Sequence, residues 1–240
     1  MKRLILKKLV IISQKNEEAR TIEFDDRLTV ITGDNPSGET KNRTGKSLVM
    51  KSIYYSLGAK LKKYTTNWDS LQISTIVTFL YDGIKYELYR DRNSFILRSD
   101  DEVKFFASIS ELKKFYVDFF EFYLKMPIKK DDENSVYAYP GAIFMPFYID
   151  QDKGWSGSWD SFSDVFTGKW KPEILLYHMG VRTREYYDLL DEKVELENEQ
   201  KENKRQLKTY EAVIKKHTEK YKDYLDLNLN TENFTDDILC

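Results

Sequence analysis

The chain has 240 residues, enough for one substantial domain and an appendage, and its 17 Tyr and 14 Phe favour a packed core. The formal net charge of −2 gives no sign of a polyanion partner, although it leaves room for a local basic patch. The single cysteine, Cys240, excludes an internal disulfide framework and a cysteine-rich metal site. The sequence has no apolar run of 18 residues and no signal peptide, which favours a cytoplasmic protein without a membrane partner.

Residues 1–60 read in chain order as strands, a loop and a helix. The stretches LILKKLVIIS, RTIEF and RLTVITG are strand candidates, with a turn at Asp25-Asp26 between the last two. After the loop, KSLVMKSIYYSLG carries apolar residues close to the i, i+4 spacing of a helix. Gly58 marks the expected C-terminal stop of that helix.

Residues 61–150 have a different character. STIVTFLYDGIKYELYRD alternates in hydrophobicity around Asp82-Gly83, a strong short-range signal for a β-hairpin, and SFILRS adds a further strand. A capping box from Ser108 to Glu111 opens an amphipathic helix. The stretch YPGAIFMPFYIDQD is predicted to be an apolar strand that ends in polar residues.

Residues 171–225 predict a long helix with a heptad seam. Seam positions recur every seven residues, and a second set follows four residues later: Leu189, Leu196, Asn203, Tyr210, His217 and Tyr224, then Leu207, Ile214 and Tyr221. Lys193, Gln200 and Asn203 weaken the middle of the seam. A solvated single helix is the alternative, but a lone helix of this length needs a partner in water, so we expect a coiled coil. Residues 226–240 are polar and are expected to form a flexible tail.

The stretch ITGDNPSGETKNRTGKSLVM, residues 31–50, ends like a nucleotide-binding P-loop. Gly45-Lys46-Ser47 matches the end of G-x-x-x-x-G-K-[ST], but Thr40 stands where that pattern has its first glycine. In a P-loop, backbone N–H groups wrap the phosphates, the lysine reaches the β- and γ-phosphate oxygens, and the following hydroxyl holds Mg²⁺. Because a predicted strand precedes this stretch and a helix follows it, the sequence predicts that it binds a nucleotide with Mg²⁺.

The segments RTIEFDDRLTVITGDNPSG and GKSLVMKSIYYSLG resemble the N-terminal half of an SMC-type ATPase head, in the SMC and RecN branch of the ABC ATPases. The resemblance implies an α/β fold: a P-loop ABC-ATPase-like half head, with a mixed sheet and antiparallel β-hairpins, that leads into a coiled-coil helix. Residues 1–170 would form the N-terminal lobe of the head and residues 171–225 the start of the arm. The altered loop favours divergent phage-defence members, such as those of Lamassu-type systems.

Two alignments of the loop with the family motif are open. Gly33 to Gly38 can match its start, with six extra residues before Gly45, or residues 40–47 can match the whole motif. The second is preferred because it keeps the spacing of Asn42 and Gly45 to Lys46. It assigns ATP binding to seven consecutive residues: Asn42, Arg43, Thr44, Gly45, Lys46, Ser47 and Leu48. The resemblance further implies that Ser47 and Gln151, the latter as the Q-loop glutamine, act at Mg²⁺.

Parts that the family needs for hydrolysis are missing from the chain. There is no apolar strand ending in Asp-Glu and no signature motif of the L-S-G-G-Q type, so no catalytic residue is identified. We expect ATP binding without turnover by this chain alone. The resemblance implies four kinds of partner: the C-terminal half of the same head, a second head in a homodimer, double-stranded DNA, and nuclease or accessory subunits.

A basic cluster near an aromatic residue is the candidate DNA contact. Lys60, Lys62 and Lys63 lie in the stretch AKLKKY, and their alternative role is a solvated helix end. The function predicted from the sequence is therefore the ATP-binding half of an SMC-like head that dimerises with ATP and acts on DNA in repair, chromosome maintenance or phage defence. The alternative is a coiled-coil scaffold subunit whose P-loop no longer binds nucleotide.

Overall fold

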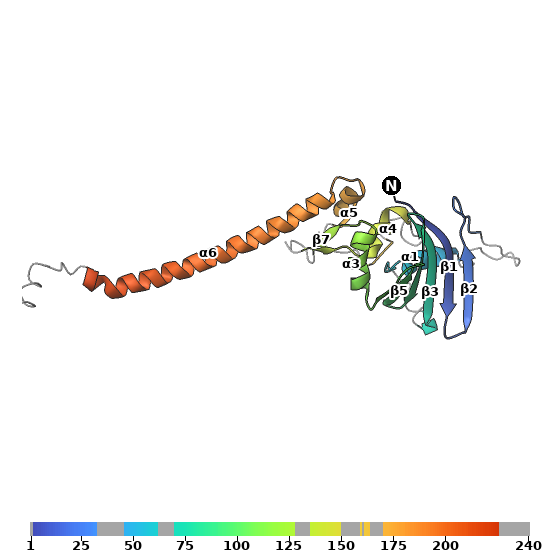
Figure 1. Cartoon of the computed structure of the whole chain (residues 1–240), viewed down its shortest axis with the longest axis horizontal. Helices are drawn as coiled ribbons and strands as arrows, with labels where there is room; N and C mark the ends of the chain where they lie inside the picture. Colours follow the sequence, from blue (N-terminus) through green and yellow to red (C-terminus); the bar gives the residue numbers. More distant parts are fainter. Residues whose placement is uncertain are drawn as a thin grey trace, which may run out of the picture. The chain divides into compact units, whose positions relative to one another are not determined.

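The computed structural model describes residues 2–32, 46–61, 70–127, 135–149, 159, 161–163 and 170–225. The chain falls into two compact units, Met1–Tyr187 and Asp188–Cys240. Six strands of the first unit form one sheet in the order β2-β1-β3-β4-β5-β6, and every described ladder in it is antiparallel (Figure 1). The strands are β1 (Leu4–Ser13), β2 (Glu18–Glu23), β3 (Ile73–Tyr81), β4 (Ile84–Asp91), β5 (Ser94–Arg98) and β6 (Val103–Phe106).

Local sequence signals account for several of these elements. The predicted strand LILKKLVIIS is β1, and Asp82-Gly83 forms the turn between β3 and β4. Both turn residues have positive φ, 52° and 81°, as expected of a tight hairpin turn. The helix α3 (Ile109–Phe119) begins at the predicted cap, where the Ser108 hydroxyl accepts a hydrogen bond from the N–H of Glu111.

The remaining elements of the described chain are helices and a small hairpin. In the first unit these are α1 (Lys46–Ser56), β7 (Lys125–Pro127), β8 (Ser135–Tyr137), α4 (Pro140–Phe144), the 3₁₀ helix η2 (Met145–Phe147) and α5 (Trp170–His178). The long helix α6 (Arg184–Leu225) starts in the first unit and continues through the second.

The core of the first unit lies between one face of the sheet and the helices. Leu9, Val77 and Leu88 come from three neighbouring strands and are fully buried. Leu57 of α1 and Leu112 of α3 belong to the same cluster of buried side chains. Burial of this apolar face fixes α1 on the sheet and therefore fixes the position of its first residue, Lys46.

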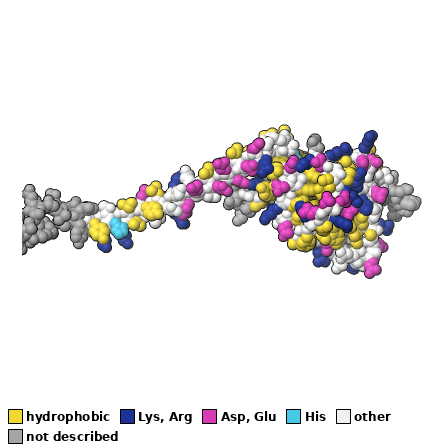
Figure 2. Space-filling view, in the orientation of Figure 1, with side chains coloured by type: hydrophobic (Ala, Val, Ile, Leu, Met, Phe, Trp, Pro, Cys, Tyr) yellow, Lys and Arg dark blue, Asp and Glu magenta, His cyan; other side chains and the backbone are white. Residues whose placement is uncertain are grey.

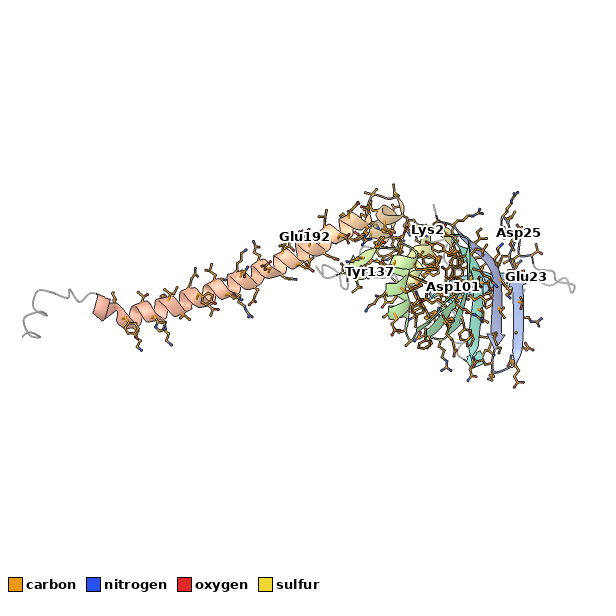
Figure 3. The ribbon with its side chains drawn as sticks, viewed as in Figure 1. Lys2, Glu23, Asp25, Asp101, Tyr137 and Glu192 are labelled. Atoms are coloured by element: carbon orange, nitrogen blue, oxygen red, sulfur yellow. The ribbon has the colours of Figure 1, made fainter. Side chains whose placement is uncertain are left out.

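The structure corrects the prediction for RLTVITG. Residues 27–32 form no strand, although β2 is observed next to β1 as predicted. The N–H of Asp25 donates to the Thr29 hydroxyl at 2.8 Å, and its carboxylate accepts from the N–H of Arg27 at 2.9 Å. These local bonds turn the chain away from the sheet after β2, near the labelled Glu23 and Asp25 (Figure 3).

The stretch YPGAIFMPFYIDQD was also predicted wrongly as a strand. Its described part forms α4 and η2, with Pro140 in the first turn of α4. Proline there suits a helix start because the first turn has no partner for its missing N–H. The buried residues Ala142, Phe144 and Met145 do not alternate as strand residues would, and a short apolar run cannot be told from a buried helix by periodicity alone.

The helix α6 has 42 residues, which corresponds to about 63 Å. Its described seam residues are exposed, with 65% of Leu189 and 64% of Ile214 accessible to solvent. The coiled coil therefore stays a prediction that rests on the sequence pattern. Within the described residues, no helix is both long and apolar enough to cross a membrane.

Candidate nucleotide-binding site

The first turn of α1 carries the described part of the predicted P-loop. Lys46 and Ser47 are the first two residues of the helix and, like Leu48, are half-buried. The free N–H groups and the positive end of the dipole at a helix N-terminus favour an anion. The structure thus confirms the predicted helix after Gly45, while Asn42, Arg43, Thr44 and Gly45 lie outside the described residues.

A pocket of about 390 Å³ opens beside this helix start. Three segments of the chain line it: the extended residues after β2, the first turn of α1 and the residues around the end of η2. The lining residues are Thr29, Ile31, Lys46, Ser47, Met50, Phe147, Tyr148 and Ile149. The volume lies within the range of about 300–1,000 Å³ that small-molecule sites occupy. Its walls are mostly apolar, and the ammonium of Lys46 and the hydroxyl of Ser47 supply the polar groups that suit a phosphate.

Tyr54, a residue of α1, holds the opposite wall of the pocket in place. The Tyr54 and Tyr148 rings lie 4.5 Å apart, and the Tyr54 hydroxyl donates to the carbonyl of Phe147 at 3.4 Å. A second bond, from the Ser161 hydroxyl to the Tyr148 carbonyl, is 3.2 Å long. Because Tyr54 lies two turns after Lys46, one helix positions both walls of the pocket.

Phe147 has an exposed ring at the rim of this wall, with 73% of its surface accessible. Its ring meets that of His178 edge-on at 5.9 Å between centroids. His178 is hydrogen-bonded to the carbonyl of Ala142 at 3.0 Å, and burial lowers the pKa of its imidazole. A neutral ring packs against Phe147 without a buried charge, so His178 supports the pocket wall as a packing residue.

The other sequence predictions lie elsewhere or outside the described chain. Gln151 lies outside the described residues; the pocket wall ends at Ile149, two positions earlier. Lys60 follows α1 at its other end, about 15 Å along the helix from Lys46, and its carbonyl accepts from the N–H of Ser163 at 2.8 Å. Lys62 and Lys63 also lie outside the described residues.

Sequence reasoning missed most of the apolar lining. Thr29, Ile31 and Met50 lie in the segments that carry the family resemblance but were given no role, and the stretch with Phe147 and Tyr148 was predicted to be a strand. The spacing from Lys46 to Tyr54, two turns of a helix, was the only available signal, and it does not name the partner of Tyr54. In the described part of the chain, no group of three or more His, Cys, Asp or Glu is placed to hold a metal.

The chain is similar to a known domain family and to known proteins. A family model described as "AAA domain" matches residues 3–227. The chain is 29% identical over 202 residues to a Lamassu protein LmuB from Bacillus cereus (strain VD014), and 32% identical over 148 residues to a Lamassu protein LmuB from Bacillus sp. (strain NCIM 5461 / CCTCC AB 2011126 / NIO-1130). These alignments cover 82% and 61% of this chain but only 34% and 24% of the relatives, so the chain spans about a third of their length or less.

These matches confirm the resemblance to a divergent SMC-like ATPase similar to Lamassu proteins. They also agree with the fold, an α/β half head with a mainly antiparallel sheet followed by a long helix. The matched residues include every described element from β1 to α6. The chain belongs to the AAA domain family.

Proposed function

We propose that this chain is the ATP-binding N-terminal half of an SMC-like ATPase head that acts in phage defence. The observation that carries the proposal is the pocket in which Lys46 and Ser47, at the start of α1, face the wall formed by Phe147, Tyr148 and Ile149. Membership of the AAA domain family and the likeness to Lamassu proteins support a nucleotide as its ligand and defence as its setting.

In this proposal, the helix start holds the phosphates. Lys46 places its ammonium at the β- and γ-phosphates, and the Ser47 hydroxyl helps to hold Mg²⁺. The backbone N–H groups of the first turn add hydrogen bonds to the phosphate oxygens. Gln151 would complete the metal site as the Q-loop glutamine, in line with the resemblance. Those groups bind and orient ATP, and none of them supplies the acid that hydrolysis requires.

The C-terminal half of the head is the first partner that we propose. Residues 28–31 read LTVI, a stretch with strand propensity, yet they pair with no strand in the described chain. Leu28 and Val30 are 74% and 71% exposed, and Ile149 across the pocket is 72% exposed. A strand from the C-terminal half would cover these apolar side chains and satisfy the free backbone groups. Such a strand would also bring the missing acidic residues to the pocket.

The remaining partners follow from the same assignment. We propose that a second head closes over the ATP, that the assembly acts on double-stranded DNA, and that nuclease or accessory subunits complete it. The basic cluster of Lys60, Lys62 and Lys63 stays the candidate DNA contact of the head. The exposed seam of α6 equally suits the alternative of a scaffold subunit without nucleotide, and measurement of ATP binding separates the two.

Thermal unfolding with and without Mg-ATP tests the proposal. We expect millimolar Mg-ATP to raise the melting temperature, because a ligand that binds only the folded state stabilises it by mass action. Lys46→Ala should abolish the shift because it removes the charge that faces the phosphates. Lys85→Ala, which removes an exposed lysine from β4, should leave the shift intact. A wild-type chain that shows no shift, or a Lys46→Ala variant that keeps it, would refute the assignment.

A further inference from the structure

The charged residues of α6 separate into an acidic half and a basic half. From Arg184 to Asn203, eight Asp and Glu stand against three Lys and Arg, a net charge of −5. From Lys204 to Leu225, seven Lys and Arg stand against three Asp and Glu, a net charge of +4. Figure 2 shows acidic side chains gathered on the part of α6 nearer its start and basic ones toward its end. The whole chain has a net charge of only −2, so this separation is a local feature.

Four lysines of α6 recur every seven residues and lie along one side of the helix, with a drift of about 20° per step. They are Lys201, Lys208, Lys215 and Lys222, which we call the lysine row, and all are exposed. At 1.5 Å per residue the steps are about 10.5 Å and the row extends over about 31 Å. Each lysine directly follows a seam position, the last of these being Tyr221. With Leu207, Ile214 and Tyr221 at heptad position a, the lysines fall at position b, on the outer side of the helix.

This placement leaves the lysine row exposed to solvent when the seam is covered. Arg205 and Lys216 also occupy outer heptad positions, so they widen the row on the same side of the helix. A helix packed on Leu207 and Ile214 would bury the seam and leave the outer side in water. Lys215 and Glu219 form an ion pair at 4.0 Å, but an exposed pair of this kind contributes little stability and does not prevent the lysine from taking another partner.

We propose that the lysine row binds the phosphate backbone of a nucleic-acid duplex. A rigid row with a regular spacing suits a polyanion that is itself stiff and regular, and a duplex presents one charge per about 1.7 Å of its axis. Lysine offers a mobile point charge, which suits phosphates and reads no base sequence. The acidic half of α6 repels phosphates, so the contact is centred on the basic half from Lys204 onward, with Lys201 just before its start. The site extends the proposed action on DNA but shares no residue with the ATP pocket.

The salt dependence of duplex binding tests the proposal. Each lost phosphate contact reduces the slope of log K against log salt by about 0.9, so the triple variant Lys208→Ala, Lys215→Ala, Lys222→Ala should lose about 2.7. The affinity should be measured by fluorescence anisotropy with a labelled duplex of about 30 base pairs, from about 50 to 200 mM salt. Replacement of the same three lysines by arginine should keep the slope, since the charge remains.

Controls separate a lysine row from a general charge effect. The triple variant Lys15→Ala, Lys85→Ala, Lys171→Ala removes the same charge from exposed positions of the first unit and should keep the slope. Circular dichroism should show unchanged helix content in the row variant, since alanine favours helices. Lys46→Ala should keep duplex binding, and the row variant should keep the shift with Mg-ATP, so failure of one proposal does not imply failure of the other.

Several results would overturn the proposal. These are no duplex binding by the wild-type chain, an unchanged slope in the row variant, or an equal loss in the control variant. A wild-type chain that binds polyglutamate as tightly as the duplex would assign the row to acidic proteins instead.

Discussion

Gly58 and Arg90 fix the C-terminal end of α1 and thereby the direction in which its first turn points. The N–H of Ala59 donates to the Tyr54 carbonyl at 3.0 Å and that of Gly58 to the Tyr55 carbonyl at 2.9 Å, a Schellman closure. The buried guanidinium of Arg90 donates to the carbonyls of Tyr55 and Ala59 and lies 3.6 Å over the Tyr55 ring. Contacts at the C-terminal end of α1 therefore help to fix the position of Lys46 at its N-terminal end.

Gly58→Ala should destabilise the fold more than Gly83→Ala. Both glycines have positive φ, 95° and 81°, so both variants carry the backbone cost of a side chain there. Only at Gly58 would the new Cβ meet a neighbour, 2.8 Å from Cδ2 of Leu112, whereas Gly83 faces open space. We expect an extra loss of about 1–3 kcal/mol in the free energy of unfolding, the usual cost of overpacking. Urea denaturation of both variants measures it, and equal losses would contradict the packing at Gly58.

The sequence identified Gly58 as a helix stop but did not reveal why the position excludes a side chain. The stop follows from the local pattern of apolar residues and glycine. The close approach of Leu112, from a helix 54 positions later in the chain, depends on how α3 packs on the sheet. Long-range packing of this kind leaves no signal in a single sequence. Arg90 was missed for the same reason, because its carbonyl partners lie on another element.

At the scale of elements, α6 differs from the helices of the head because its seam residues from Leu189 onward are exposed within the described chain, although Tyr187 in its first turn is buried. Leu207 is 57% exposed, whereas Leu112 of α3 is fully buried. Both are leucines within helices, so they form a matched pair for the same substitution. The same substitution at Leu207 and at Leu112 tests whether the seam already contributes to the stability of this chain or is packed only when a partner is bound.

Leu207→Ala should change the free energy of unfolding by less than about 0.5 kcal/mol, since exposed substitutions away from special features do little. Leu112→Ala should cost about 2–5 kcal/mol because it leaves a cavity in the core. Thermal and urea unfolding at low protein concentration, where copies do not pair, measure both. If Leu207→Ala cost as much as Leu112→Ala, the seam would already be packed in the isolated chain.

Strands with alternating patterns and turn signals were predicted well, and apolar runs without alternation were not. The hairpin at Asp82-Gly83 and the strand β1 follow from local sequence. The run from Pro140 to Met145 is buried on several sides, which removes the alternation of a half-exposed strand. Residues 27–32 have the pattern of a strand, but strand pairing needs a partner that the described chain does not supply.

At the scale of the whole molecule, the candidate site joins segments about a hundred residues apart. The sequence predicts Lys46 and Ser47 from the end of the motif and from the helix after it, which the structure shows as α1, while the strand predicted before the loop is absent from residues 27–32. The opposite wall, from Phe147 to Ile149, could not be predicted, because it depends on the contact between Tyr54 and Tyr148. Family membership agrees with a nucleotide as the ligand. The central claim is therefore that this composite pocket binds ATP.

Equilibrium dialysis of radiolabelled ATP with Mg²⁺ tests that claim most directly. The account predicts saturable binding to a single site in the wild-type chain and loss of that binding in Lys46→Ala. Removal of Mg²⁺ with a chelator should weaken it, since the Ser47 hydroxyl would help to hold a metal ion that offsets the phosphate charge. Lys85→Ala serves as the control and should bind as the wild type does. No saturable binding by the wild type, or equal binding by Lys46→Ala, would contradict the account.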